Sequence, residues 1–367
     1  MQAGRPHHNK AAQRLPSLPS FASSFRDLVS GRRRGFGAAA SRTLLRGAEL
    51  VYAAGIRLRN YRYDAGRLPI DRVDVPVVSV GNVTLGGTGK TPMVEWLAHW
   101  YRARGVRVVL VSRGYGAEQG AANDEALELE QRLPDVPHVQ NPDRVAASKM
   151  AIEEFESQLV ILDDGFQHRR LARDLDIVLI DALEPFGFEH VFPRGTLREP
   201  LGGLARAQVI ALSRADAVSA EDRSAIEKRI RRYAPAATWI EVSHPPRRLV
   251  NAAGQQEPLG TIAGRRVAAF CGIGNPAGFR HTLTSTGANV VALREFPDHH
   301  AYTREDVESL SQWVASLNVD AVVCTGKDLV KLRVESLGGL PLWALAIELE
   351  IGRGREDFEV RLSKVLV

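Results

Sequence analysis

The sequence predicts an α/β protein with a doubly wound, mostly parallel sheet and a second, smaller Rossmann-like α/β domain. Short apolar segments alternate with helical ones between residues 77 and 233, a pattern typical of a parallel sheet covered on both faces. The alternation begins again near Ala263. The chain has 367 residues, which is enough for about two domains at roughly 150 residues each.

The composition is that of an ordinary globular protein. Hydrophobic residues make up 44% of the chain and charged residues 25%, so a sizeable core is possible. The two cysteines, Cys271 and Cys324, offer no disulfide framework and suit a reducing compartment. Neither has the spacing of a metal ligand, and we expect both to be small buried residues on strands.

The positive charge is concentrated at the N-terminus. Residues 1–72 carry 14 Lys and Arg against 4 Asp and Glu, a net charge of +10, whereas residues 73–367 carry 34 against 39, a net charge of −5. Residues 1–24 are rich in Pro, Ser, Gln and His without apolar periodicity, and residues 31–35 form an Arg-rich cluster. We therefore expect residues 1–40 to be a disordered basic extension.

Residues 41–72 are expected to contain an amphipathic helix, because Leu44, Val51 and Ile56 belong to an apolar series spaced mainly by three and four. Two interpretations remain open: a helix on an anionic membrane surface, or a helix packed on the domain with a solvated charged face. An arm that binds nucleic acid is a weaker third. The longest apolar run, residues 50–56, is too short to span a bilayer, and no signal peptide is evident, so we expect a cytoplasmic protein.

A glycine-rich turn follows the first expected strand. The valine-rich residues 77–80 lead into Gly81-Asn82-Val83-Thr84-Leu85-Gly86-Gly87-Thr88-Gly89-Lys90-Thr91-Pro92 and then into a helical segment at 91–104. Glycines let backbone N–H groups surround an anion, Lys90 reaches the β- and γ-phosphates, and the Thr91 hydroxyl can ligate Mg²⁺. Thr84 replaces a usual glycine, yet a turn that binds nothing does not explain Lys-Thr at the helix start. The sequence predicts a P-loop that binds a nucleoside triphosphate through Gly86, Gly87, Thr88, Gly89, Lys90 and Thr91.

The strands expected after this loop end in polar residues. Strands are expected at 106–111, 159–162, 177–180 and 209–212, and helices at 146–155 and 220–233. Ligands bind at the carboxyl ends of such strands, and Asp163 and Asp164 directly follow the strand at 159–162. Paired carboxylates after an apolar strand, downstream of a P-loop, are the Walker B arrangement. A helix N-cap is the structural alternative, but it needs only one Asp.

The second half of the chain repeats the alternation. Strands are expected at 267–271, 289–293 and 321–325, and helices at 278–285 and 303–316. The string Gly272-Ile273-Gly274-Asn275-Pro276 lacks the third glycine of the dinucleotide fingerprint, so we interpret it as a tight turn. We expect a P-loop kinase domain at residues 73–262 and a smaller α/β domain at residues 263–367 that closes the active-site cleft.

Together these motifs resemble the lipid A 4′-kinase (tetraacyldisaccharide 4′-kinase) family over roughly residues 42–335. The most family-specific string is Asp163-Asp164-Gly165-Phe166-Gln167-His168. The P-loop agrees with it, as do Ser112-Arg113-Gly114-Tyr115-Gly116, Leu197-Arg198-Glu199-Pro200, Gly272-Ile273-Gly274-Asn275-Pro276, Phe296-Pro297-Asp298-His299-His300 and Lys327-Asp328-Leu329-Val330-Lys331-Leu332.

The resemblance implies ATP- and Mg²⁺-dependent phosphoryl transfer to the 4′-hydroxyl of tetraacyldisaccharide 1-phosphate in lipid A biosynthesis. It also implies a location at the cytoplasmic face of the bacterial inner membrane. The implied partners are the lipid substrate and an anionic membrane surface, with no nucleic acid and no obligate protein partner.

The resemblance also implies roles for individual residues. Asp124 would be the base for the sugar hydroxyl, assisted by a histidine, for which we favour His299 over His300. The implied catalytic residues are Asp124, His299, Lys90 and Asp164. The implied Mg²⁺ environment consists of Thr91, Asp163, Asp164 and Glu199.

The chain departs from the family pattern at three places, and two other functions remain open. Asn123 stands where a glycine is usual, residues 187–196 match only loosely, and Gly326 stands where a Glu is usual. The runner-up function is a membrane-associated P-loop GTPase, because Ser213-Arg214-Ala215-Asp216 loosely resembles a guanine-reading loop. A non-catalytic lipid-surface module is a third hypothesis, but it leaves the carboxylate pairs unexplained.

Overall fold

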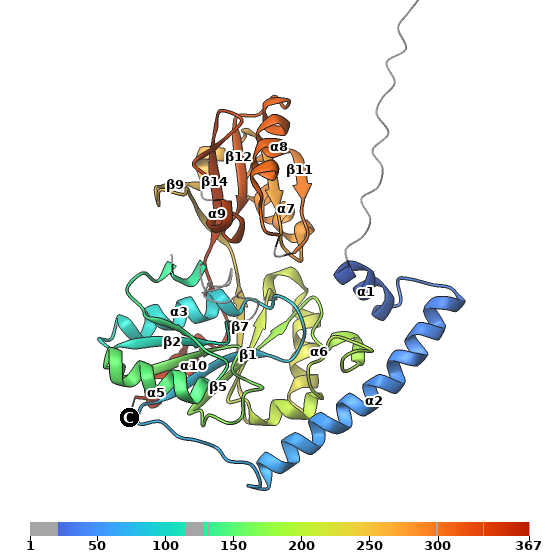
Figure 1. Ribbon diagram of the computed structural model, residues 1–367, viewed down its shortest axis with the longest axis vertical. Helices are drawn as coiled ribbons and strands as arrows, with labels where there is room; N and C mark the ends of the chain where they lie inside the picture. The colour runs from blue at the N-terminus through green and yellow to red at the C-terminus, as the bar shows by residue number, and fades with distance from the viewer. Residues whose placement is uncertain (1–20, 115–127, 131, 299, 333, 367) are drawn as a thin grey trace, which may run out of the picture.

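The computed structural model describes residues 21–114, 128–130, 132–298, 300–332 and 334–366. Two sheets organise this part of the chain, and Figure 1 shows them one above the other. The larger sheet has the strand order β15 (Glu350–Ile351), β7 (Thr238–Ser243), β6 (Val209–Ser213), β5 (Leu175–Asp181), β1 (Val77–Asn82), β4 (Leu159–Asp163), β2 (Val108–Ser112) and β3 (His138–Gln140).

The larger sheet is parallel except at one edge, where β15 pairs with β7 in the antiparallel sense. Its central strands are buried along their whole length, because helices cover both faces. One face packs α3 (Lys90–Arg102) and α10 (Arg355–Lys364), and the other packs α5 (Arg144–Phe155) and α6 (Ala220–Ile230). The doubly wound parallel sheet expected from the sequence is confirmed.

The smaller sheet has the strand order β11 (Asn289–Glu295), β10 (Arg266–Cys271), β12 (Ala321–Thr325), β14 (Leu340–Ile347), β8 (Pro246–Val250) and β9 (Gln256–Pro258), with β13 (Ser336–Leu337) paired to β14. Its first four strands are parallel, and β8 and β9 are antiparallel. Its helices are α7 (Pro276–Ser285), α8 (Arg304–Ala315) and α9 (Gly326–Leu332). Thr303 and Asp306 form a capping box at α8, which explains why that helix begins where expected.

Short 3₁₀ turns complete the connections: η1 (Gly187–Glu189), η2 (Leu201–Arg206), η3 (Ala215–Ala217) and η4 (Leu259–Ile262). Cys271 and Cys324 are both buried and reduced on strands, as expected. Burial raises the pKa of the Cys271 thiol to about 12, so it remains protonated at neutral pH.

The expected boundary between the two domains needs correction. The smaller sheet already begins at β8, before residue 263, and the end of the chain returns to the larger sheet as β15 and α10. Phe358 and Leu362 of α10 are fully buried in the core beneath α3. A ten-residue helix with so short an apolar face has no sequence signal for which sheet it will cover, and only the fold decides this.

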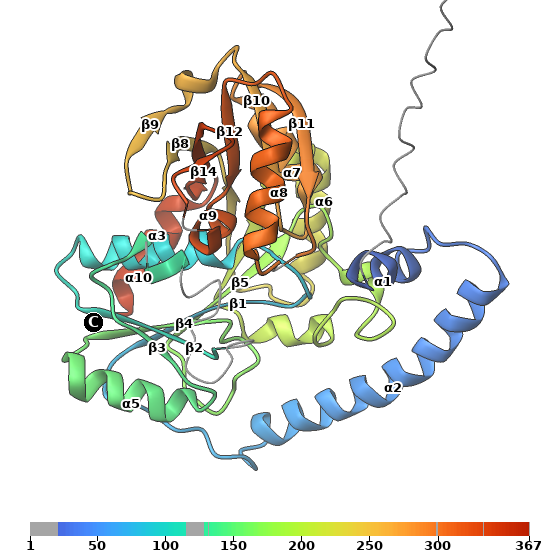
Figure 2. The same cartoon turned by 45° about the horizontal axis from the view of Figure 1, so that its top comes forward.

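The expected disordered extension is also wrong for part of its length. Residues 21–29 form α1 (Phe21–Val29), and α2 (Phe36–Asp64) begins five residues before the expected helix at 41. Contacts with the larger domain explain α1, because Arg26 pairs with Glu184 at 2.8 Å and Phe25 packs on Phe192. Figures 1 and 2 both show α2 as a long helix along one side of the larger domain.

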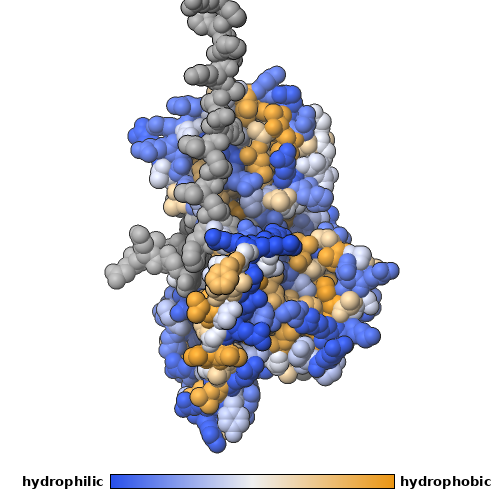
Figure 3. All heavy atoms as spheres, turned by 90° about the vertical axis from the view of Figure 1, so that its right-hand side faces the viewer, coloured by the Kyte–Doolittle hydropathy of each residue, from blue (hydrophilic) through white to orange (hydrophobic). Residues whose placement is uncertain are grey.

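Helix α2 leaves many apolar side chains in solvent. The exposed ones are Phe36, Leu44, Leu50, Val51, Tyr52, Leu58 and Tyr61. Figure 3 views this side of the molecule and shows hydrophobic residues interspersed with hydrophilic ones. Of the helices in the described ranges, none combines the length and the hydropathy that a membrane span requires.

We expect Phe358→Ala to lower the free energy of unfolding by about 3–5 kcal/mol, because its buried ring stacks on Trp96 of α3. Val360→Ala is the matched control on the same helix, and since Val360 is exposed it should cost less than about 0.5 kcal/mol. Urea unfolding followed by tryptophan fluorescence measures both. Equal effects of the two substitutions would contradict the packing of α10 on the larger domain.

Candidate functional site

The strand, loop and helix expected around residues 77–104 are present. Residues 83–89 connect β1 to α3, which begins at Lys90 with Gly89 at its N-cap. Gly89 has a φ of 86°, and a Cβ atom there would lie 2.8 Å from His244 Nε2, so both conformation and packing require glycine. The first N–H groups of α3 have no partner within the helix and are available to an anion.

Side chains and backbone from elsewhere hold this loop in place. Asn82 Nδ2 donates a hydrogen bond to Thr88 Oγ1 at 3.0 Å, which closes the loop on itself. The first half of the loop pairs with a second segment, because Leu85 N donates to Thr196 O and Arg198 N donates to Val83 O, both at 2.7 Å. The loop is therefore braced from both ends.

Asp164 holds two cations beside the loop. Its carboxylate lies 3.6 Å from Lys90 Nζ and accepts hydrogen bonds from Arg198 Nη1 at 2.7 and 2.9 Å. Burial by itself would raise the pKa of this carboxyl, but Lys90 and Arg198 outweigh burial and hold that pKa below its usual range. Asp164 is therefore ionised at neutral pH and fixes both cations near the start of α3.

Thr91 and Asp163 supply oxygen atoms next to this cluster. Thr91 lies in the first turn of α3, Asp163 ends β4 opposite Val80 of β1, and both residues are buried. Within the described ranges, no group of three or more His, Cys, Asp or Glu is placed to hold a metal. Mg²⁺ usually needs only one or two protein carboxylates, because phosphates and water fill its octahedron. This sparse oxygen set fits a magnesium ion that arrives with a triphosphate.

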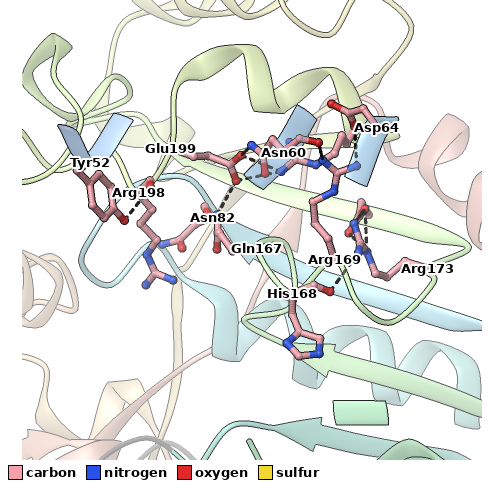
Figure 4. A network of polar contacts seen from close by, with 12 residues as sticks. Tyr52, Asn60, Asp64, Asn82, Gln167, His168, Arg169, Arg173, Arg198 and Glu199 are labelled. Carbon is pink, nitrogen blue, oxygen red and sulfur yellow. Dashed lines mark hydrogen bonds and ion pairs between the residues drawn. The ribbon is translucent and has the colours of Figure 1, made fainter. Parts of the chain in front are cut away.

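Glu199, which we expected to complete the Mg²⁺ environment, is held by other side chains in this structure. Its fully buried carboxylate accepts hydrogen bonds from Arg206, Asn60 and Gln167 at 2.9 to 3.1 Å. Figure 4 shows Glu199 between Asn60 of α2 and Gln167. The turn η2 brings Arg206 back onto Glu199, and a buried carboxylate needs such partners. Spacing along the chain could not reveal this pairing.

A buried arginine, Arg144, and a half-buried histidine, His168, lie near the two aspartates. Burial, followed by Arg113, lowers the pKa of Arg144, whereas Asp164 and Asp163 act to raise it. Burial, together with Arg144, lowers the pKa of His168 to about 4, so this ring is neutral at neutral pH. Arg144 Nε and His168 Nε2 are buried without a hydrogen-bond partner in the described structure. Such atoms mark a place where a polar ligand can bind.

Sequence reasoning missed both Arg144 and Arg198 as candidate site residues. Arg144 is the first residue of α5, where an arginine is ordinarily solvated, so only its burial distinguishes it. Arg198 belongs to the string Leu197-Arg198-Glu199-Pro200, which matches the family, but we predicted no function for it from the sequence. The signal available for Arg198 was its position next to Glu199 in that string.

The expected base and its partner, Asp124 and His299, lie outside the described residues, as does Asn123. His300 lies within them and is engaged elsewhere. Its Nε2 atom is 3.0 Å from Asp306 Oδ2, and its ring stacks on Phe296 with centroids 4.8 Å apart. His300 is therefore committed to the N-terminus of α8.

The string that loosely resembled a guanine-reading loop also borders the P-loop. Arg214 pairs with Asp181 and donates a hydrogen bond to Gly87 O at 3.0 Å. His244, in the link from β7 to β8, is half-buried with its Nε2 atom next to Gly89, and burial followed by Arg214 lowers its pKa to about 4. Arg214 therefore supports the loop backbone.

One arginine links α3 to the smaller sheet. Arg132 contacts Glu95 of α3 at 2.8 Å and Glu128 at 2.9 Å, and it donates a hydrogen bond to Ile347 O at 3.4 Å. Burial would lower the pKa of Arg132, but Glu128 and Glu95 outweigh it and raise that pKa. This charged contact joins the helix of the P-loop to the end of β14.

Comparisons with known proteins identify relatives over most of the chain. The model of the family described as tetraacyldisaccharide-1-P 4′-kinase matches residues 41–367. The tetraacyldisaccharide 4′-kinase of Anaeromyxobacter dehalogenans (strain 2CP-C) is 39% identical over 335 residues, which are 86% of this chain and 88% of that protein. That of Geobacter sulfurreducens is 35% identical over 364 residues, or 93% of this chain and 98% of that protein.

A solved structure gives the same result. The crystal structure described as the "apo" form of LpxK from Aquifex aeolicus, in complex with ATP, has a TM-score of 0.72 and 29% sequence identity. The match covers 89% of this chain and 99% of that one. The residues matched by the family model, 41–367, include most of α2, both sheets and the P-loop. The chain therefore belongs to the tetraacyldisaccharide-1-P 4′-kinase family.

Proposed function

We propose that this protein transfers the γ-phosphoryl group of ATP to the 4′-hydroxyl of tetraacyldisaccharide 1-phosphate, a step of lipid A biosynthesis. Membership of the family supports the reaction, and the relatives carry that activity in their names. The observation that carries the proposal is the contact of Asp164 with Lys90 and Arg198 beside the start of α3. That arrangement suits a triphosphate, whose transfer requires positive charge around the moving phosphoryl group.

In this proposal the P-loop backbone surrounds the phosphates, through Gly86, Gly87, Thr88 and Gly89. Lys90 supplies a positive charge to the β- and γ-phosphates, and Asp164 holds its ammonium group in place. Arg198 adds a second charge at the same carboxylate. Because both cations are fixed before ATP binds, little reorganisation is needed when charge develops in the transition state.

The residues that would hold Mg²⁺ are Thr91, Asp163 and Asp164. When bound, the ion would neutralise charge on the phosphate oxygens. Thr91 lies at the start of α3 and Asp163 at the carboxyl end of β4. Because both residues are buried, few water molecules compete with their oxygen atoms for the ion. Glu199, the fourth residue that the resemblance implies for this environment, accepts hydrogen bonds from Arg206, Asn60 and Gln167.

The acceptor side of the site rests on the resemblance and on one structural observation. Asp124 would take the proton of the sugar hydroxyl, with His299 as its partner. The engagement of His300 by Asp306 supports the choice of His299. The buried nitrogen atoms of Arg144 and His168 suit an anionic or hydroxylated headgroup next to the aspartates.

The GTPase hypothesis is not favoured. The family match covers the whole region from residue 41 to residue 367 and names a kinase of a lipid disaccharide. Arg214, the counterpart of the lysine in a guanine-reading loop, is paired with Asp181 and bonded to the P-loop backbone. The third hypothesis, a non-catalytic lipid module, does not account for the cations around Asp164.

We also propose that α2 lies on the surface of the bacterial inner membrane, at its cytoplasmic face. Leu44, Val51 and Leu58 follow one another at seven-residue intervals on one side of the helix and are 60–77% exposed. Burial of each such side chain contributes about 1.5–3 kcal/mol, and each nearby arginine about 1 kcal/mol on an anionic surface. An acceptor with four acyl chains would keep its sugar head at that surface.

We expect Lys90→Ala to reduce turnover by at least about 100-fold without unfolding the protein, because the lysine contributes charge to the transition state and little to the core. Transfer of label from γ-labelled ATP to tetraacyldisaccharide 1-phosphate in detergent micelles measures turnover. Lys149→Ala, an exposed lysine on α5, is the control and should behave as wild type. Near-normal turnover of Lys90→Ala would exclude the P-loop as the ATP site.

Asp124→Ala should lower kcat by about 10²–10⁴-fold and change the KM for ATP little, because a base for the hydroxyl touches the acceptor. His299→Ala should act in the same direction. If the two residues work as a unit, the double variant loses less than the product of the single losses. His300→Ala is the control, and a larger loss of kcat for it than for His299→Ala would reverse their assignment.

Replacing Leu44, Val51 and Leu58 together by Gln should reduce sedimentation with anionic vesicles at both low and high salt, since apolar burial is not screened. Replacing the exposed Arg46, Arg57 and Arg62 by Gln should reduce it mainly at low salt, because screening weakens the charge term. Unchanged sedimentation of both variants would leave α2 as ordinary domain packing.

A further inference from the structure

Helix α2 contacts the larger domain through polar side chains at several points along its length. Glu49 accepts hydrogen bonds from His190 and from Val191 N, and Tyr52 Oη donates to Arg198 O at 3.2 Å. Asn60 Nδ2 donates to Glu199 Oε2 at 3.1 Å. All these partners belong to one segment, residues 190–199. Helix α2 therefore fixes that segment along much of its length.

The same segment pairs with the first half of the P-loop. Thr84 and Leu197 form an antiparallel bridge, and the hydrogen bonds from Leu85 N to Thr196 O and from Arg198 N to Val83 O flank it. The 190–199 segment is thus a layer between α2 and the loop. A shift of α2 on the domain would move this layer and, with it, the loop backbone.

A chain of side chains runs through the same layer, as Figure 4 shows. Glu199 accepts hydrogen bonds from Asn60 and from Gln167 Nε2, both at 3.1 Å. Gln167 Nε2 also donates to Asn82 O at 2.9 Å, and the Asn82 side chain donates to Thr88 Oγ1. Four hydrogen bonds connect α2 to the side of the P-loop that leads into α3.

The burial of Glu199 makes this chain sensitive to its members. The carboxylate has no solvent exposure, so its charge depends on Arg206, Gln167 and Asn60 for stabilisation. Arg206 is fixed in turn, because its guanidinium lies over the Phe166 ring. Loss of Asn60 would leave Glu199 short of one donor, and the carboxylate would draw more strongly on Gln167, which also holds Asn82.

We propose that Asn60 is a positioning residue, through which α2 holds the P-loop in its ATP-binding geometry by way of Glu199 and Gln167. The helix that would lie on the lipid surface is then also a structural part of the nucleotide site. This inference rests on the proposed binding of ATP at the P-loop. It assigns to α2 an effect on ATP affinity that attachment to a membrane does not require.

The test compares Asn60→Ala with Asp64→Asn in the full chain in detergent micelles. Asp64 is the matched control, because it lies one turn further along α2 and its carboxylate pairs with Arg169 at 2.6 Å; Arg169 also contacts Asn60, but only at the backbone carbonyl, which Asn60→Ala keeps. Asn60→Ala should raise the KM and the Kd for ATP by about three- to tenfold, the size of one neutral hydrogen bond, because the loss at Glu199 reaches the loop only through Gln167. Its KM for the lipid acceptor should stay at the wild-type value, and Asp64→Asn should change neither constant.

The link through Gln167 is tested by a double-mutant cycle on the Kd for ATP. Gln167→Ala should raise the Kd for ATP, as Asn60→Ala does. In the double variant the fold-increase in Kd should be smaller than the product of the two single fold-increases. Asn60→Gln, which keeps an amide donor, should restore part of the affinity. The proposal would be overturned if the fold-increase in Kd of the double variant equalled the product of the single fold-increases. It would also be overturned if Asn60→Ala and Asp64→Asn raised the Kd equally.

These outcomes are separable from a failure of the proposed function. If wild type bound no ATP and Lys90→Ala changed nothing, the function itself would be wrong. If wild type bound ATP and Asn60→Ala bound it equally well, only the role of Asn60 would be wrong. Should Asn60→Ala melt below the assay temperature, Gln167→Ala still tests the link from the other side of Glu199, and Asn60→Gln tests it from α2.

Discussion

The ion cluster at Asp164 is the interaction on which the candidate site depends. Lys90 is the first residue of α3, and Arg198 comes from a segment far away in sequence, yet both contact the Asp164 carboxylate. Without this carboxylate the two positive charges would repel each other at the positive end of the helix. The parallel pairing of β1 with β4 makes the contact possible, because it brings the ends of the two strands together. The net attraction of the two cations lowers the pKa of Asp164 in spite of burial, so the cluster remains charged.

A second, more deeply buried cluster supports the first. Glu199 and Arg206 form a pair beneath the P-loop, and a buried pair of this kind is favourable only when its remaining hydrogen-bonding groups are satisfied. Gln167 and Asn60 provide that satisfaction from two different elements. Arg132 makes a second link to α3, because it contacts both Glu95 of α3 and Ile347 at the end of β14. The helix of the P-loop is thus connected both to α2 and to the smaller sheet.

The repeating elements of the fold could be predicted because each has a local cause. The apolar runs at β4, β5 and β6 are bounded by polar residues, and Thr303 with Asp306 marks the start of α8. Short elements without such signals were missed: β3 has three residues, β15 has two, and α10 carries only a short apolar face. The longer strands β7 and β14 were also missed, although both contain apolar residues. The expected disordered extension, residues 1–40, ended too late in the chain. Helix α1 lies within it and is stabilised by contacts with Glu184 and Phe192, which are remote in sequence.

The sequence by itself determined the class of the fold, the P-loop and the family, because these depend on residue types in a fixed local order. The string from Gly81 to Thr91 predicts an anion site, and Asp163-Asp164 after an apolar strand predicts its acidic neighbours. Only the tertiary structure decided the partners of each charge. In the tertiary structure Asp164 pairs with Lys90 and Arg198. Glu199 pairs with Arg206 and accepts hydrogen bonds from Asn60 and Gln167. Partners of buried charges are chosen by distances between segments remote in sequence, and spacing along the chain carries no information about those distances.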